Sequence, residues 1–233
     1  MSVDTSQRVV PREVWVIRLG GLFGLLALLL SVVASFALTP SPSPAGDARP
    51  EEIAAFFADH ADSTGLGHGL RNLAFILHAV FAVGLYTLIA RTADSGAKAW
   101  GILALVASAA VLAVGTVNNG VATAAFLDLP VFAEHPELRL LLWDLSYVVF
   151  MAARLVWTGI TTGFSIAGWQ SGALPRWLCI VGLIAGFTAL VTAVAIVQRI
   201  EGGWPGVFST ANMPAQLVFY IGVCVQMLRR AAG

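Results

Sequence analysis

A stripe of seven side chains follows one face of the long apolar segment 138–167. They recur every three or four residues, the spacing that brings side chains to one side of a helix: Asp144, Tyr147, Met151, Arg154, Thr158, Thr161 and Ser165. A charged group halfway along such a segment costs at least ~2.5 kcal/mol in a bilayer, so Arg154 needs a polar partner. Asp144 is too distant to pair with it directly, because the intervening helix spans ~15 Å.

Polar side chains also interrupt three other apolar segments. Those at a comparable depth in the outer half are Arg71 and Asn72 in segment 70–90, Asn118 and Asn119 in segment 99–127, and Asn212 in segment 208–228. His78, also in segment 70–90, lies at roughly mid-membrane. With the stripe, these side chains predict a polar cavity in which Arg71, Asn119, Asp144 and Arg154 converge. The ligand-binding candidates are Arg71, Asn72, His78, Asn118, Asn119, Asp144, Tyr147, Arg154 and Asn212. Asp144 and His78 are the candidates for acid or base catalysis.

The same residue types also have a purely structural use. Buried Asn, Thr, Ser and Arg side chains often do no more than join helices by hydrogen bonds, each worth roughly 0.6–2 kcal/mol. A single buried histidine such as His78 is more typical of a hydrogen-bonded core than of a ligand site. Cys179 and Cys224 are typical of small packing residues in apolar helices.

Several kinds of chemistry are excluded by missing motifs. A membrane haem held by two histidines needs a second one at the depth of His78, and the sequence offers none. No HExxH, CxxC or phosphate-binding glycine motif occurs, so we expect no metal and no cofactor. The chain also has no basic patch for a nucleic acid. The expected partners are therefore membrane lipids and a small amphipathic ligand, with the oligomeric state open.

These polar residues lie in a chain dominated by long apolar runs. Six runs of about twenty residues or more match the ~30 Å hydrocarbon core of a bilayer at 1.5 Å per residue: 14–38, 70–90, 99–127, 138–167, 177–197 and 208–228. With 58% hydrophobic and 11% charged residues, the chain has too few polar groups to cover a soluble globule. The sequence therefore predicts an all-α, six-helix membrane bundle that forms a single domain over residues 1–233.

Charge and composition predict the topology of this bundle. With the N-terminus inside, eight Lys and Arg residues lie on the inner side and four on the outer side, which favours an orientation with both termini inside. The one long connection, an outer loop over 39–69, contains apolar residues at helical spacing between 50 and 61. We therefore expect a short amphipathic helix there.

Two segments of the chain carry a resemblance to a known family. One is the stretch GALPRWLCIVGLIAG, from Gly172 to Gly186, and the other is the ending LYTLIAR of the second run. Together with the six runs and the long first outer loop, they resemble the DUF4386 family of bacterial integral membrane proteins. The resemblance covers about residues 10 to 230. It implies the six-helix fold and a multi-pass location in the bacterial plasma membrane, and it brings no established activity or catalytic residues.

Three classes of function follow from the sequence. The first is binding or transport of a small polar or amphipathic ligand in an outward-facing cavity between the second, third, fourth and sixth runs. The second is an intramembrane enzyme acting on a lipid or isoprenoid substrate, with Asp144 or His78 as the acid or base and Arg154 holding an anionic group. The third is a structural or accessory subunit whose polar residues bond only to its own helices.

Overall fold

A computed structural model describes residues 12–39, 48–194 and 205–232, and every regular element among them is a helix. The helices are α1 (Arg12–Phe36), α2 (Pro50–Asp59), α3 (Ala61–Ala90), α4 (Ser95–Ala124), α5 (Pro130–Glu134), α6 (Glu137–Ala152), α7 (Arg154–Ser171), α8 (Arg176–Val194) and α10 (Pro205–Ala232). Long apolar segments form helices in a bilayer because a helix satisfies its own backbone hydrogen bonds there.

Six candidate spans confirm the predicted all-α membrane bundle. They are α1, α3, α4, the pair α6 and α7 together, α8, and residues Ala211–Ala231 within α10. Several helices run past the predicted bounds, and α3 already begins at Ala61, so residues 61–69 belong to the helix rather than to the loop. The segment predicted as a short amphipathic helix is helical over Pro50–Asp59.

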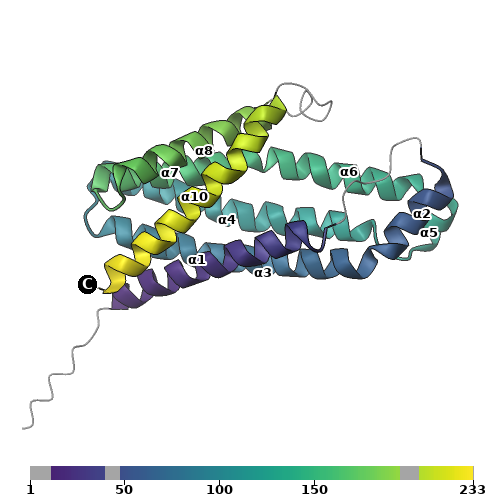
Figure 1. The fold of residues 1–233 in the computed structure, drawn as a ribbon, viewed down its shortest axis with the longest axis horizontal. Helices are drawn as coiled ribbons and strands as arrows, with labels where there is room; N and C mark the ends of the chain where they lie inside the picture. Colours follow the sequence, from purple (N-terminus) through teal and green to yellow (C-terminus); the bar gives the residue numbers. More distant parts are fainter. Residues whose placement is uncertain (1–11, 40–47, 195–204, 233) are drawn as a thin grey trace, which may run out of the picture.

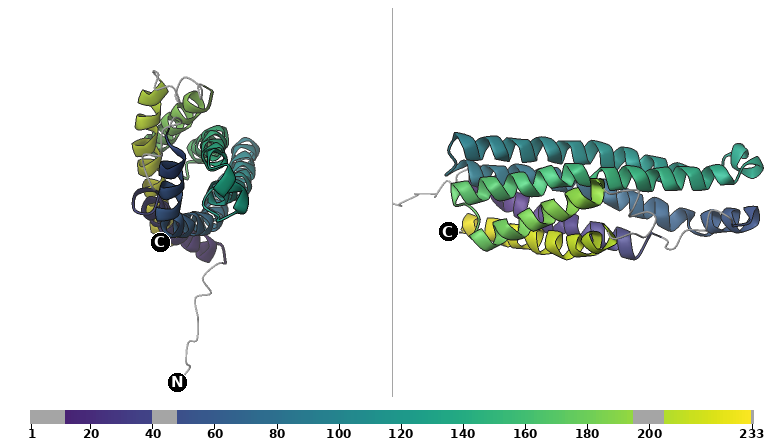
Figure 2. Two further views of the ribbon diagram at one scale, coloured as in Figure 1. Left: turned by 90° about the vertical axis from the view of Figure 1, so that its right-hand side faces the viewer. Right: turned by 90° about the horizontal axis from the view of Figure 1, so that it is seen from above.

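The six spans form a closed ring. Each span packs against its neighbours in the sequence, and α1 also packs against α10, which closes the ring. Figure 1 shows α3, α4 and the α6–α7 pair as the long helices, with α1, α8 and α10 over one part of their length. The views in Figure 2 show the same ring along and across its axis. In Figure 1, α1 begins and α10 ends at the same end of the bundle, here called the terminal end.

The opposite end, here called the α2 end, has a small apolar core of its own. It contains buried residues from α2, from α6 and from the end of α4: Ile53, Phe57, Ala125, Phe126 and Leu140. Trp143 packs against this core, and Trp169 lies near the terminal end of the same span. The two indoles are ~39 Å apart along the helix axis at 1.5 Å per residue, close to the full thickness of a bilayer with its interfaces. The α2 end therefore lies at one membrane surface.

Local sequence explains where α4 begins and α7 ends. Asp94 caps α4, because its carboxylate accepts a hydrogen bond from the Ala97 backbone N–H at 2.8 Å. Helix α7 ends at Ser171, and the next residue, Gly172, has a φ of 68°, which lies in the left-handed region that glycine adopts without steric cost. The chain can then turn back at once into α8.

The fourth span is not one regular helix. Helix α6 ends at Ala152 and α7 begins at Arg154, with Ala153 between them. The Ala153 backbone keeps right-handed dihedrals, so the axis continues while the regular helix is interrupted. The Ala153 N–H donates to the Val149 carbonyl and the Ala153 carbonyl accepts from the Trp157 N–H, so the helical path continues across this point.

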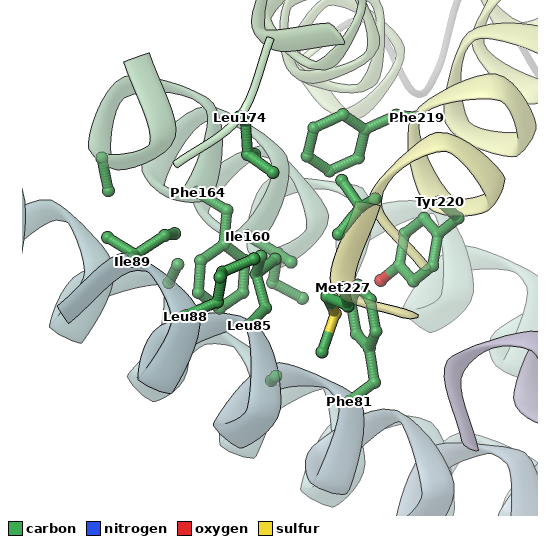
Figure 3. Close-up of a cluster of buried hydrophobic side chains, with 14 of the residues drawn as sticks. Phe81, Leu85, Leu88, Ile89, Ile160, Phe164, Leu174, Phe219, Tyr220 and Met227 are labelled. Carbon is green, nitrogen blue, oxygen red and sulfur yellow. The ribbon is translucent and has the colours of Figure 1, made fainter. Parts of the chain in front are cut away.

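The centre of the bundle is mainly apolar. Figure 3 shows its main cluster, in which Phe81 and Leu85 of α3, Ile160 and Phe164 of α7, and Tyr220 of α10 lie together. Around this cluster, glycines allow close helix contacts. A Cβ atom on Gly182 of α8 would lie only 2.0 Å from Ser165 Oγ of α7, for example.

Candidate functional site in the middle of the bundle

The nine predicted ligand-binding residues do not form one set. Most of them separate into three groups with different partners: Arg71 beside the end of α1, the asparagines of α3 and α4, and a central group that contains His78, Arg154 and Asn212. Asp144 and Tyr147 are exposed on α6. The predicted convergence of Arg71, Asn119, Asp144 and Arg154 on one cavity is therefore wrong.

Arg71 joins α3 to the end of α1. Its Nη2 donates to Thr39 Oγ1 at 2.7 Å and lies 3.4 Å from Ser35 Oγ. Thr39 in turn donates to the Ala34 carbonyl at 2.8 Å. This arrangement fastens two helices together near the α2 end, which is a structural role.

A polar seam joins α3 and α4. Asn119 Nδ2 donates to Asn72 Oδ1 at 2.7 Å, and one turn further His68 Nδ1 lies 2.7 Å from Thr123 Oγ1. Because the Thr123 hydroxyl donates its proton to the Asn119 carbonyl, the proton of the second bond must come from His68. Asn118, next to this seam, is half-buried, and its Oδ1 has no hydrogen-bond partner among the described residues.

The stripe predicted along the fourth span holds only in part. Met151, Thr161 and Ser165 are buried, and Arg154 and Thr158 are half-buried, as expected for a face that points into the bundle. Asp144 and Tyr147 are exposed instead, and the exposed fraction of Tyr147 is 40%. The change from exposed to buried falls within α6, between Tyr147 and Met151. Asp144 follows Trp143 near the membrane surface, where an exposed carboxylate costs far less than at the bilayer centre.

Arg154 finds its polar partner on α10. Its Nη1 donates to Asn212 Oδ1, and its guanidinium carbon lies 5.4 Å from the centre of the Phe150 ring. The fully buried Asn212 also donates through Nδ2 to the Ala185 carbonyl at 2.8 Å and to Thr188 Oγ1 at 2.9 Å. One amide therefore bridges α7, α8 and α10 and places the arginine near the centre of the bundle.

His78 lies further toward the terminal end, in an aromatic setting. Its Nδ1 is 2.9 Å from the Tyr220 hydroxyl, and its ring centre is 5.3 Å from that of Trp157 and 5.7 Å from that of Phe81. Figure 3 shows Tyr220 and Phe81 in the central cluster, where their rings stack at 5.0 Å. His78 and Tyr220 lie ~18 Å along their helices from the terminal end, which is mid-membrane.

Helix α10 connects these two polar groups. Asn212, Gln216 and Tyr220 are spaced by four residues and so lie along one side of the helix. Asn212 contacts Arg154 at one end of this line, and Tyr220 contacts His78 at the other. We call these five residues the central polar line.

Two nitrogen atoms of the central polar line lack partners. His78 Nε2 and Gln216 Nε2 are both buried and have no hydrogen-bond partner among the described residues. The whole His78 side chain is buried, with 4% of its surface exposed. A buried polar group without a partner costs about 1–3 kcal/mol, so each of these two nitrogens carries an unused capacity for a hydrogen bond.

Three members of this line were predicted from the sequence, and two were not. Asn212, His78 and Arg154 were predicted, whereas Gln216 and Tyr220 were not assigned to the site. Their four-residue spacing from Asn212 was the available signal. Among the described residues, no group of three or more His, Cys, Asp or Glu side chains is arranged to hold a metal ion.

A family model described as a domain of unknown function, DUF4386, matches residues 15–230. The chain belongs to the DUF4386 family. No match was found among curated proteins or among solved structures. The DUF4386 match spans all six membrane helices and therefore every residue of the central polar line.

Proposed function

We propose that this multi-pass membrane protein binds a small polar or amphipathic molecule at the central polar line. The observation that carries the proposal is the pair of buried, unpartnered nitrogens at His78 and Gln216. A chain that served only as structure would gain stability from apolar side chains at these two positions, because unpartnered polar groups are costly in a membrane.

The contacts around the line favour an amphipathic ligand. Arg154 and Asn212 form its polar end, and the rings of Trp157, Phe81 and Tyr220 surround the imidazole at the other end. Helices α7 and α10 make little direct backbone contact, so side chains bridge them at this level. A molecule with a polar head and an apolar body would match these side chains.

The proposed setting is the bacterial plasma membrane, with both termini inside. The excess of Lys and Arg near the terminal end supports this orientation: Arg12, Arg18, Arg91, Lys98, Arg176, Arg229 and Arg230 are all exposed near that end. The ligand then binds at mid-membrane and is reached from the lipid or from the outer side.

Native mass spectrometry of the purified full chain tests the binding. We expect a small molecule to stay bound to the wild-type protein and to the Asp144→Asn variant, because Asp144 is exposed and lies outside the line. The Gln216→Leu variant removes one hydrogen-bonding group, and we expect its occupancy to fall about tenfold, the effect of ~1.4 kcal/mol.

Two outcomes would contradict the proposal. If no molecule binds any of the three proteins even after incubation with a membrane lipid extract, the structural-subunit hypothesis takes its place. If Gln216→Leu retains the same bound molecule at full occupancy and Asp144→Asn loses it, the site lies at α6 instead.

A further inference from the structure

We propose that the ligand of the central polar line is a quinone, a flat ring that carries neutral carbonyl oxygens on an apolar, isoprenoid-type tail. This inference rests on the proposed binding function and names its ligand class. It follows from the direction of the hydrogen bonds, from the rings around His78 and from the depth of the site.

The direction of the bond between Tyr220 and His78 determines which nitrogen carries a proton. If the Tyr220 hydroxyl donates to Nδ1, the proton of the neutral imidazole lies on Nε2, and only that N–H lacks a partner. In the opposite direction, both the hydroxyl proton and the Nε2 lone pair would lack partners. Native proteins keep buried unpartnered groups to a minimum, so the first arrangement holds.

Both free groups on the line are therefore donors. His78 offers one N–H at Nε2, and the amide nitrogen of Gln216 carries two. Donors of this kind bind oxygen atoms with lone pairs, such as carbonyl oxygens. A ligand that presents its own N–H or ammonium groups would leave these donors unpartnered.

The surroundings of His78 favour a flat, neutral ring. Trp157, Phe81 and Tyr220 place three aromatic rings within 5.3 to 5.7 Å of the imidazole, centre to centre. Aromatic side chains gain from stacking against a planar ligand. At this mid-membrane depth an anionic head would bear a large desolvation cost. Arg154, the cation that the described residues place on this line, is bound to Asn212 and lies beside the Phe150 ring.

Among lipid-soluble molecules, a quinone combines these properties. Its two carbonyl oxygens accept hydrogen bonds at opposite edges of a planar ring, and its tail stays in the hydrocarbon. His78 N–H would donate to one carbonyl and Gln216 to the same oxygen or to the other. No electron transfer is required for this binding.

The test uses the full chain in phosphatidylcholine nanodiscs with a decyl benzoquinone whose carbonyl carbons are labelled with ¹³C. We expect the infrared carbonyl band to move to lower wavenumber on binding, because a hydrogen bond weakens the C=O bond. Quenching of tryptophan fluorescence gives the Kd. In His78→Phe the shifted band should disappear and the Kd should rise about tenfold.

The matched control is His68→Phe, a buried histidine of the same helix in the polar seam. It should keep the wild-type band and Kd. If His78→Phe does not fold, Gln216→Leu takes its place with the same expected rise in Kd. Decanoic acid and decanol serve as carboxylate and hydroxyl probes with equal tails.

The outcomes separate this inference from the binding function. A quinone that binds wild type and His78→Phe equally, or a decanoate that binds more tightly than the quinone, overturns the quinone assignment and leaves a ligand site. If none of the three probes binds and no molecule co-purifies with the chain, the proposed binding function fails as well.

Discussion

A close crossing between α1 and α3 makes a quantitative prediction. Helices α1 and α3 meet at Gly20 and Gly84, with Met227 of α10 beside them. A Cβ atom on Gly84 would lie 2.9 Å from Gly20 Cα, 2.9 Å from the Val16 carbonyl oxygen and 2.8 Å from Met227 Cε. The methionine tip can move, but the two backbone atoms can yield only if the helices move apart. Gly84→Ala should therefore destabilise the bundle.

Gly69→Ala in the same helix is the matched comparison. A Cβ atom there meets nothing within 4 Å, and Gly69 is exposed. Both substitutions gain the same helix propensity, roughly 1 kcal/mol, so this gain cancels when the two variants are compared. What remains is the steric cost at the crossing, about 1–3 kcal/mol for an overpacked methyl group.

The assay is reversible unfolding in mixed micelles, titrated with sodium dodecyl sulfate and followed by helical circular dichroism. Gly69→Ala should unfold at the wild-type detergent fraction or above it, and Gly84→Ala below it. The double variant Gly20→Ala/Gly84→Ala should lose less stability than the sum of the losses of the two single variants. Once α1 and α3 have moved apart for one methyl group, the second one also fits. Equal midpoints for Gly84→Ala and Gly69→Ala would refute the close crossing.

Two further predictions concern the polar seam and the topology. Asn72→Leu and Asn119→Leu should each destabilise the bundle. The double variant should lose less unfolding free energy than the sum of the two single losses, and the difference, the coupling energy of a double-mutant cycle, should be about 0.6–1.7 kcal/mol. Additive effects would show that the asparagines do not interact. An impermeant maleimide should label Asp128→Cys on intact cells and Asp94→Cys only after permeabilisation, because both positions are exposed at opposite ends of α4 while the native cysteines are buried. The reverse pattern would place the termini outside.

The fold was predictable because a bilayer leaves a long apolar chain few alternatives. Backbone groups in hydrocarbon must bond within their own segment, so each long run forms a helix. The prediction was least accurate for the start of α3, because Gly65 and Gly69 are residues typical of a flexible loop. In the structure they are exposed positions of a continuous helix, where glycine is tolerated at a modest cost.

The candidate site was predictable only in part, because periodicity gives the face of a helix and not the neighbour it meets. Arg154 and Asn212 were recognised as polar residues within apolar runs, but nothing in their spacing indicates that they bond each other. Asp144 shares the helical spacing of Arg154, yet it is exposed, because this part of α6 lies near the α2 end beside Trp143, at the membrane surface.

The sequence by itself determined that this chain is a six-helix membrane bundle of the DUF4386 type and that its candidate functional residues are the polar residues within the apolar runs. Hydrophobicity and length suffice for this, since both act on each segment separately. Only the tertiary structure decided which of these polar residues contact each other. It brought His78 to Tyr220 and Arg154 to Asn212 across the bundle, and separated Arg71 and Asp144 from them. The reason is that such contacts depend on how the helices are rotated and ordered around the ring, which close packing of many side chains determines together.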